Sequence, residues 1–235
     1  MKIYSQGDKA IIISMEKDVS KNVTRDLIAL RSHLLNKDLP FITEIVPTES
    51  DMMITYNARD MIKHHHITSP FQYMKDLIHS IYQELRNQDT VKEDSTTYNI
   101  PIIYGDEFGP DLEQLLDYYQ LTKEAFIQLH SETSYFVSMM GYLPGFPYLT
   151  GMNDKLYVNH TCDEKKLVPA GSVIIEGKKC GIVTTDTYND WLVIGYTPLE
   201  LFSPDKEEFN LLKLGDSVTF KPQGRKDIEL GDYKS

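Results

Sequence analysis

An eleven-residue segment near the middle of the chain, from Gly141 to Gly151, constrains the fold more than any other stretch. It holds three glycines, two prolines and three aromatic residues. Each proline fixes its own φ, removes a backbone donor and restricts the residue before it, so the segment can be neither a regular helix nor an interior strand. Glycine supplies conformations closed to other residues. The segment therefore predicts a rigid, irregular loop that presents Tyr142, Phe146 and Tyr148.

Two interpretations of this loop remain open. Rigid aromatic side chains lose little entropy when they are buried against something else, so the loop suits a pocket wall or a protein interface. The simpler interpretation is a hydrophobic corner that plugs one end of a β-barrel. Taken alone, the segment favours the simpler interpretation.

Charge and composition exclude several classes of partner. A net charge of −11 disfavours nucleic acid, because phosphate binding needs clustered Lys and Arg. No apolar run approaches membrane-spanning length, and the first residues lack the pattern of a secretory signal. We therefore expect a cytoplasmic protein that binds neither nucleic acid nor membrane. Only Cys162 and Cys180 occur, without metal-type spacing, which favours reduced thiols.

The first hundred residues mix helical and strand patterns. Apolar residues recur at helical spacing over residues 23–34 and 74–85, and Ser69-Pro70 is a good start for the second helix. Strand-like runs are found at residues 10–14, 41–46, 52–56 and 98–104. The resulting β-α-β-β-α-β order matches a ferredoxin-like α/β unit.

The rest of the chain has a different character. Two short helices are predicted within residues 110–131, the second capped by Thr122, and we expect them to bridge two domains. Short strand-like runs punctuated by glycine then favour a barrel or a sandwich. We therefore expect an α+β protein with an α/β domain over residues 1–97, a β domain over residues 98–222 and a charged tail over residues 223–235.

Polar candidates outside the loop each have a simpler structural interpretation. Ser172 follows Gly171 at the start of a predicted strand, where its hydroxyl and nearby amides could meet an anion or an amide. The residues alone favour a plain turn into the strand, and no nucleophile-elbow pattern surrounds Ser172, so a serine hydrolase is not predicted. Trp191 is most simply a core residue with its indole N–H satisfied.

The histidines are weak candidates for metal binding. His64, His65 and His66 are consecutive and point in different directions, so they cannot all reach one ion, and no metal site is predicted. His130 ends a predicted helix, where it would by default interact with free carbonyls. Facing a cleft, it could instead bind a ligand or titrate near neutrality.

Taken as an ordered set, a series of motifs closely resembles the allophanate hydrolase subunit 1 family, which includes the B subunit of bacterial 5-oxoprolinase and the KipI-type inhibitors of sporulation histidine kinases. The motifs are Tyr104-Gly105-Asp106, Gly109-Pro110-Asp111-Leu112, His130-Ser131, Tyr135-Phe136-Val137, Gly141-Tyr142-Leu143-Pro144-Gly145-Phe146-Pro147-Tyr148-Leu149, Val168-Pro169-Ala170-Gly171-Ser172-Val173, Gly195-Tyr196-Thr197-Pro198-Leu199, Leu201-Phe202 and Gly215-Asp216.

The resemblance implies an α/β domain followed by a cyclophilin-like β-barrel. It also implies a partner of the subunit 2 type, that is, the C subunit of 5-oxoprolinase or a KipA-like protein. The implied reaction is the ATP-dependent opening of 5-oxoproline to glutamate, in a complex similar to the carboxyltransferase part of urea carboxylase. The chain has no phosphate-binding motif of the form GxxxxGK followed by Ser or Thr. We therefore expect it to bind no cofactor and to be inactive alone, with ATP used by the assembled complex.

The resemblance also implies a groove for substrate or partner, without naming catalytic residues. Its predicted members are His130, Tyr142, Pro144, Phe146, Pro147, Tyr148, Pro169, Ser172, Trp191 and Thr197.

Many relatives carry arginine within the stretch that corresponds to residues 159–166 and directly after the counterpart of Gly195, and this chain departs from that pattern. It also has Asn189-Asp190 before Trp191, where relatives often have two glycines. Arginine binds carboxylates through a bidentate fork that Tyr or Lys does not reproduce. The departure keeps two alternatives open: a regulatory protein of the KipI type that binds and inhibits a sensor histidine kinase, and a diverged paralogue that keeps only a scaffold role.

Overall fold

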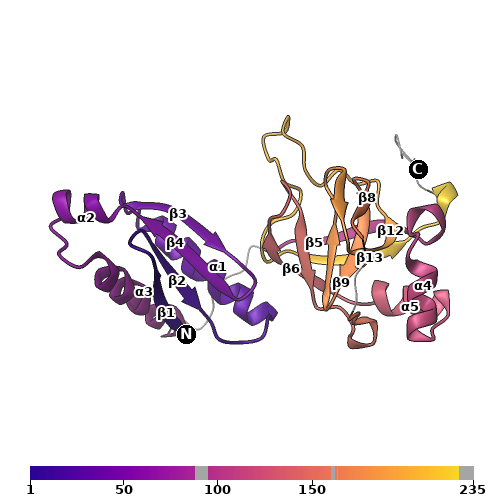
Figure 1. Cartoon of the computed structure of the whole chain (residues 1–235), viewed down its shortest axis with the longest axis horizontal. Helices are drawn as coiled ribbons and strands as arrows, with labels where there is room; N and C mark the ends of the chain where they lie inside the picture. Colours follow the sequence, from indigo (N-terminus) through magenta and orange to yellow (C-terminus); the bar gives the residue numbers. More distant parts are fainter. Residues whose placement is uncertain (88–94, 160–161, 163, 228–235) are drawn as a thin grey trace. The chain divides into compact units, whose positions relative to one another are not determined.

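The computed structural model describes residues 1–87, 95–159, 162 and 164–227, and the chain divides into two compact units, residues 1–94 and 95–235 (Figure 1). Most of the predicted tail, residues 228–235, lies outside the described residues, as do residues 88–94 before the second unit. Among the residues that are described, no helix combines the length and the apolar character needed to cross a membrane.

The first unit is a four-stranded antiparallel sheet with helices packed on one face. Residues on alternate positions of the inner strands, such as Ile11, Ile13, Met52 and Ile54, are fully buried against the helices. The strand order is β1-β2-β4-β3. The elements are β1 (Lys2–Gln6), β2 (Ala10–Ser14), α1 (Lys21–Asn36), β3 (Ile42–Pro47), β4 (Asp51–Tyr56), α2 (Ala58–His64) and α3 (Pro70–Asn87).

Both predicted long helices are confirmed. Helix α1 buries Val23, Leu27, Leu30 and Leu34 along one face, and the side chain of Ser20 accepts a hydrogen bond from the Val23 amide at its start. Helix α3 begins at Pro70, as the sequence indicates. The short helix α2 was not predicted.

One strand assignment in the first domain is wrong. Residues 98–104 do not complete its sheet, because β5 (Thr97–Tyr104) belongs to the second unit and pairs in parallel with β13 (Ser217–Pro222). The edge next to β2 is occupied instead by β1, an antiparallel strand that the sequence did not predict. The α+β class holds, with the fourth strand supplied from the N-terminus.

The second unit is a closed seven-stranded barrel in the order β10-β7-β6-β13-β5-β12-β9, which fits the cyclophilin-like barrel expected from the resemblance (Figure 1). A separate two-stranded sheet is formed by β8 and β11. The remaining strands are β6 (Tyr135–Met140), β7 (Pro147–Thr150), β8 (Lys166–Val168), β9 (Ser172–Glu176), β10 (Lys179–Ile182), β11 (Thr187–Asn189) and β12 (Leu192–Tyr196), and the short 3₁₀ helices are η1 (Asp106–Phe108), η2 (Asp154–Leu156) and η3 (Arg225–Asp227).

Helices α4 (Leu112–Tyr119) and α5 (Lys123–Ser131) lie within the second unit. We expected them to bridge two domains, but their apolar residues, including Leu112 and Phe126, are part of the barrel core. Thr122 caps α5, as predicted, because its side chain accepts a hydrogen bond from the Ala125 amide at 3.2 Å.

Candidate functional site

Residues 141–146 form a loop that connects β6 to β7, and the rest of the segment up to Gly151 is mostly β7 itself. Tyr142 and Gly145 have positive φ values of 72° and 74°, which makes the loop compact and irregular. The prediction that the whole segment is irregular is wrong from Pro147 onward, because residues 147–150 form strand β7. Pro147 occupies the first position of that strand, one of the positions where a missing N–H is tolerated.

The aromatic residues of the segment lie on the outside of the barrel. Along β9, Val173 and Ile175 point into the barrel core, whereas Ile174 packs with Phe146 and Trp191 on the outer face. Phe146 is only 1% exposed although it sits outside the barrel. The loop is therefore not a plug in the end of the barrel but a cover over one side of it.

Four side chains form what we call the aromatic cluster: Tyr142, Phe146, Tyr148 and Trp191. Phe146 is at its centre, with ring centroids 5.7 Å from Tyr142, 5.0 Å from Tyr148 and 6.2 Å from Trp191, all in edge-to-face geometry. Gly181 of β10 lies beneath it, and a Cβ atom added to Gly181 would come within 2.5 Å of the Phe146 ring. The absence of a side chain at this position lets the ring lie directly on the sheet.

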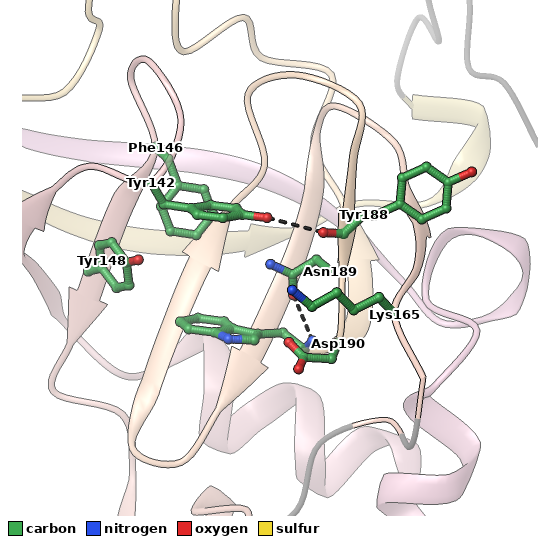
Figure 2. Close-up of a pocket in the computed structure, with 8 residues that line it drawn as sticks. Tyr142, Phe146, Tyr148, Lys165, Tyr188, Asn189 and Asp190 are labelled. Carbon is green, nitrogen blue, oxygen red and sulfur yellow. Dashed lines mark hydrogen bonds between the residues drawn. The ribbon is translucent and has the colours of Figure 1, made fainter.

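A pocket of about 130 Å³ opens beside the aromatic cluster. Figure 2 shows Tyr142, Phe146 and Tyr148 on one side of it, and Tyr188 with the polar side chains on and beside β11 on the other. Its lining residues are Tyr142, Phe146, Tyr148, Lys165, Tyr188, Asn189, Asp190 and Trp191.

Two hydrogen bonds tie the walls of the pocket together (Figure 2). The hydroxyl of Tyr142 donates to the carbonyl of Tyr188 at 3.1 Å, which joins the loop to β11. The side-chain oxygen of Asn189 accepts from the Trp191 amide at 2.7 Å. The Asn189 NH₂ group points toward the aromatic side in Figure 2. It has no acceptor among the residues that the structure describes, so it can donate to a ligand.

The polar side of the pocket carries both signs of charge. Lys165 is exposed and Asp190 is half-buried, and both line the opening. Burial raises the pKa of the nearby Glu176 carboxyl, the charge of Asp190 raises it further, and Lys179 opposes both effects. The pocket can therefore offer a ligand an apolar wall, a cation, an amide donor and a carboxylate acceptor.

An ion pair next to the pocket fixes the position of β8. Lys166 pairs with Asp111, whose carboxylate also accepts a hydrogen bond from the Val193 amide at 2.6 Å. The contact connects the start of α4, strand β8 and strand β12, and so sets where the neighbouring Lys165 lies. None of these contacts was predicted from the sequence.

Four of the ten predicted groove residues meet at the pocket, namely the aromatic cluster. Pro144 is exposed on the loop, and its carbonyl accepts a hydrogen bond from the Thr184 hydroxyl at 2.7 Å. Pro147 is buried in β7. The residues Pro169, Ser172 and Thr197 do not line the pocket either.

The turn before β9 joins the end of β12. Thr197 is fully buried, and its amide donates to the Gly171 carbonyl at 2.8 Å. Ser172 is only 3% exposed and accepts a hydrogen bond on its backbone carbonyl from the Val183 amide at 2.9 Å. These contacts favour the simpler interpretation of this motif as a turn into a strand.

The structure places His130 in the barrel core, away from the pocket. Its Nδ1 atom is 2.7 Å from the hydroxyl of Tyr104, and its Nε2 atom is 3.8 Å from the sulfur of Cys180. The imidazole stacks on Phe126 with centroids 6.1 Å apart. Complete burial lowers the pKa of His130 to about 3, so the side chain does not titrate near neutrality.

The three consecutive histidines do not converge. His65 lies 3.3 Å from the carboxylate of Asp60, and His64 is exposed at the end of α2. In the part of the chain that the structure describes, no group of three His, Cys, Asp or Glu side chains could hold a metal ion.

Comparison with known proteins identifies the family of this chain. Residues 1–212 match the family model described as carboxyltransferase domain, subdomain C and D. The chain belongs to this family. A curated relative from Bacillus subtilis (strain 168), named as the B subunit of 5-oxoprolinase, is 32% identical over 96% of this chain and 94% of the relative. A protein of the same name from Escherichia coli O157:H7 is 30% identical over 94% and 95%. The resemblance to the allophanate hydrolase subunit 1 family is thereby confirmed.

Solved structures share the fold of this carboxyltransferase-domain chain. The crystal structure of TTHA0988 matches with a TM-score of 0.75 and 23% identity, over 94% of this chain and 41% of that one. The urea carboxylase of Kluyveromyces lactis matches with a TM-score of 0.73 and 12% identity, over 95% of this chain and 22% of that one. The chain therefore spans about two fifths and about one fifth, respectively, of these longer proteins.

Proposed function

We propose that this chain is a non-autonomous subunit of an ATP-dependent 5-oxoprolinase-type cyclic amide hydrolase. It would open 5-oxoproline to L-glutamate together with a subunit 2 type partner, the C subunit of 5-oxoprolinase or a KipA-like protein. The observation that carries the proposal is the match, near 30% identity along more than nine tenths of both chains, to proteins named as the B subunit of 5-oxoprolinase. The lack of a GxxxxGK motif followed by Ser or Thr supports a role for another subunit in using ATP.

The pocket beside the aromatic cluster is the proposed substrate site. Its volume of about 130 Å³ is below the roughly 300–1,000 Å³ of sites for drug-sized ligands, so it suits one small ring. The ring would lie against Phe146 and Trp191. Lys165 would attract the carboxylate of 5-oxoproline as a point charge, without the bidentate fork that arginine gives.

Asn189 and Asp190 would bind the cyclic amide itself. The NH₂ of Asn189 can donate to the amide oxygen, whose negative charge grows as water attacks the carbonyl carbon. The Asp190 carboxylate can accept from the ring N–H. This arrangement orients the bond to be cleaved but supplies no nucleophile and no phosphate site, which is consistent with a subunit that is inactive alone.

Reconstitution tests the proposal. The chain would be combined with its subunit 2 type partner and the remaining protein of the complex, and glutamate formation from 5-oxoproline and ATP would be measured. We expect turnover only in the full assembly. The Lys165→Ala variant should raise the KM about tenfold or more, because a hydrogen bond to a charged group is lost. The Lys155→Ala variant, which removes an exposed cation outside the pocket, should behave as wild type.

An assembled complex without turnover would reject the enzyme hypothesis. The alternative is then a KipI-type regulator, which one observation favours: the rim residues Tyr142 and Tyr188 are 55% and 66% exposed, as an aromatic protein-binding surface would be. In that case the chain should inhibit autophosphorylation of a sensor histidine kinase. The Tyr142→Ala variant should relieve the inhibition, whereas Lys155→Ala should not.

A further inference from the structure

A second pocket lies within the first unit, among residues that the proposed function does not use. Its volume is about 450 Å³, compared with about 130 Å³ for the pocket on the barrel. It is formed by the turn before β2, by the paired strands β3 and β4, and by the first residues of α2. This volume is in the range of sites that bury a small organic molecule.

Two cations line this pocket without a partner of opposite charge. Lys9 and Arg59 are both exposed, and neither forms an ion pair with any residue that the structure describes. Asp8 is the acidic residue among the lining side chains, so the walls carry an excess of one positive charge. In a chain of net charge −11, such an excess needs an explanation. The guanidinium of arginine matches the geometry of carboxylate and phosphate groups.

A pair of hydroxyl groups adds one hydrogen-bond donor to the same walls. Thr43 on β3 and Thr55 on β4 lie with their Oγ1 atoms 2.7 Å apart. One hydroxyl donates to the other in this bond, so the second hydroxyl keeps a hydrogen for a ligand. The register of β3 against β4 shifts at Thr43, and such bulges commonly re-aim a side chain.

The wall behind these groups is rigid. Tyr56 is 3% exposed, and its amide donates to the Lys9 carbonyl at 2.8 Å, which ties the turn before β2 to the end of β4. Burial, and then the negative charge of Asp8, raise the pKa of the Tyr56 hydroxyl. The phenol therefore stays protonated and can act as a donor at neutral pH.

We propose that this pocket binds a small molecule carrying a phosphate or a carboxylate group. Arg59 and Lys9 neutralise the anion, and whichever hydroxyl of the Thr43–Thr55 pair keeps its hydrogen donates to one of the anion's oxygens. Asp8 accepts from a hydroxyl or amino group on the rest of the ligand, which distinguishes such a molecule from a simple inorganic anion. The site belongs to the α/β unit and is independent of the barrel pocket, so it is a candidate for an effector rather than for the cyclic amide.

The test uses the full ¹⁵N-labelled chain and two probes, inorganic phosphate and succinate, each titrated at constant ionic strength with sodium chloride as the balancing salt. We expect saturable chemical-shift changes at the amides of Lys9 and Tyr56. The Arg59→Ala variant should weaken binding roughly tenfold to a hundredfold, since it removes charge-assisted hydrogen bonds. The matched control Lys63→Ala removes another exposed cation of α2 that does not line the pocket and should keep wild-type affinity.

The responses to phosphate and to succinate identify the class of ligand. A response to phosphate alone identifies a phosphate ligand, and a response to succinate alone identifies a carboxylate ligand. The proposal is overturned when neither probe gives saturable shifts at these amides, or when Arg59→Ala and Lys63→Ala bind the responding probe with equal affinity. Because the probes and the readout do not involve the barrel pocket, failure here would leave the 5-oxoprolinase proposal unaffected.

Discussion

Replacing Gly181 by alanine tests whether the aromatic cluster depends on the close approach of Phe146 to the sheet. The new Cβ atom would lie 2.5 Å from the Phe146 ring, and ordinary contact begins near 3.4 Å, so the ring must move by about 1 Å. Gly181 does not have a positive φ, so alanine fits its backbone conformation and the expected effect is steric alone.

The size of the expected destabilisation depends on the side chains that contact the Phe146 ring. Phe146 is 1% exposed and packs edge-to-face on Tyr148 and Trp191, so a shift of this size disturbs both ring contacts. Each such contact contributes about 0.5–1.5 kcal/mol beyond its buried area. We therefore expect Gly181→Ala to lower the free energy of unfolding of the barrel by about 1–3 kcal/mol, the usual cost of overpacking.

Urea unfolding monitored by tryptophan fluorescence is a suitable assay, because Trp191 is the chain's single tryptophan and belongs to the cluster. The matched control is Gly141→Ala in the same connection, where an added Cβ meets nothing within 4 Å; it should be neutral or stabilising by up to about 1 kcal/mol. The double variant Gly181→Ala with Phe146→Leu should be more stable than the sum of the two single effects. Equal unfolding midpoints for Gly181→Ala and Gly141→Ala would show that the packing argument is incorrect.

Two further predictions concern buried polar groups. The pKa of His130 is about 3 in the folded chain and near 6.5 in the unfolded chain, so only the unfolded state gains a proton as the pH falls between these values, and the free energy of unfolding decreases. From pH 7 to pH 5 this loss is about 2 kcal/mol. The His130→Gln variant should lack this part of the pH dependence in urea titrations. The Asp111→Ala variant leaves the buried Val193 amide and the Lys166 ammonium without their acceptor, so the free energy of unfolding should fall by about 2 kcal/mol. As a control, Lys206→Ala breaks the ion pair with Glu200, in which both side chains are more than half exposed. A change above about 1 kcal/mol in its free energy of unfolding would contradict the expected difference between this exposed pair and the Lys166–Asp111 pair.

The elements that the sequence predicts well are those fixed by local pattern. Helices α1 and α3 have a full apolar face and a clear start, so their sequences determine both their existence and their buried side. The strands β3 and β4 are neighbours along the chain and pair with each other, so their hairpin can be recognised from the turn between them.

Strands whose partners are distant in sequence were assigned incorrectly or missed. The pattern of β5 indicates a strand but not its sheet, since its parallel partner β13 begins only at Ser217. Strand β1 is a mostly exposed edge strand, and four of its five residues are exposed, so it lacks the apolar alternation that would reveal it. In both cases the deciding interaction is tertiary, and no local propensity encodes it.

The barrel pocket likewise combines residues that a local sequence pattern reveals with residues that only tertiary contacts bring together. The aromatic half of the pocket could be predicted, because prolines and glycines around Phe146 mark an irregular, side-chain-presenting segment. The polar half could not, since Lys165 and Asn189 lie in or beside β8 and β11 and carry no distinctive spacing. His130 failed as a groove residue because its partner Tyr104 comes from β5, and only the closed barrel brings the two together inside the core.

The single lysine of the barrel pocket limits how tightly the chain alone can bind an anionic substrate. Lysine holds a carboxylate through one compact charge, and an exposed Lys165 is well solvated, so this contact alone gives weak and poorly directed binding. The rigid elements of the site are instead the Phe146 packing and the Asn189 hydrogen bond to the Trp191 amide. The isolated chain should therefore bind 5-oxoproline weakly. Tight binding in the assembly would then require a partner surface that covers the exposed rim at Tyr142 and removes water from Lys165.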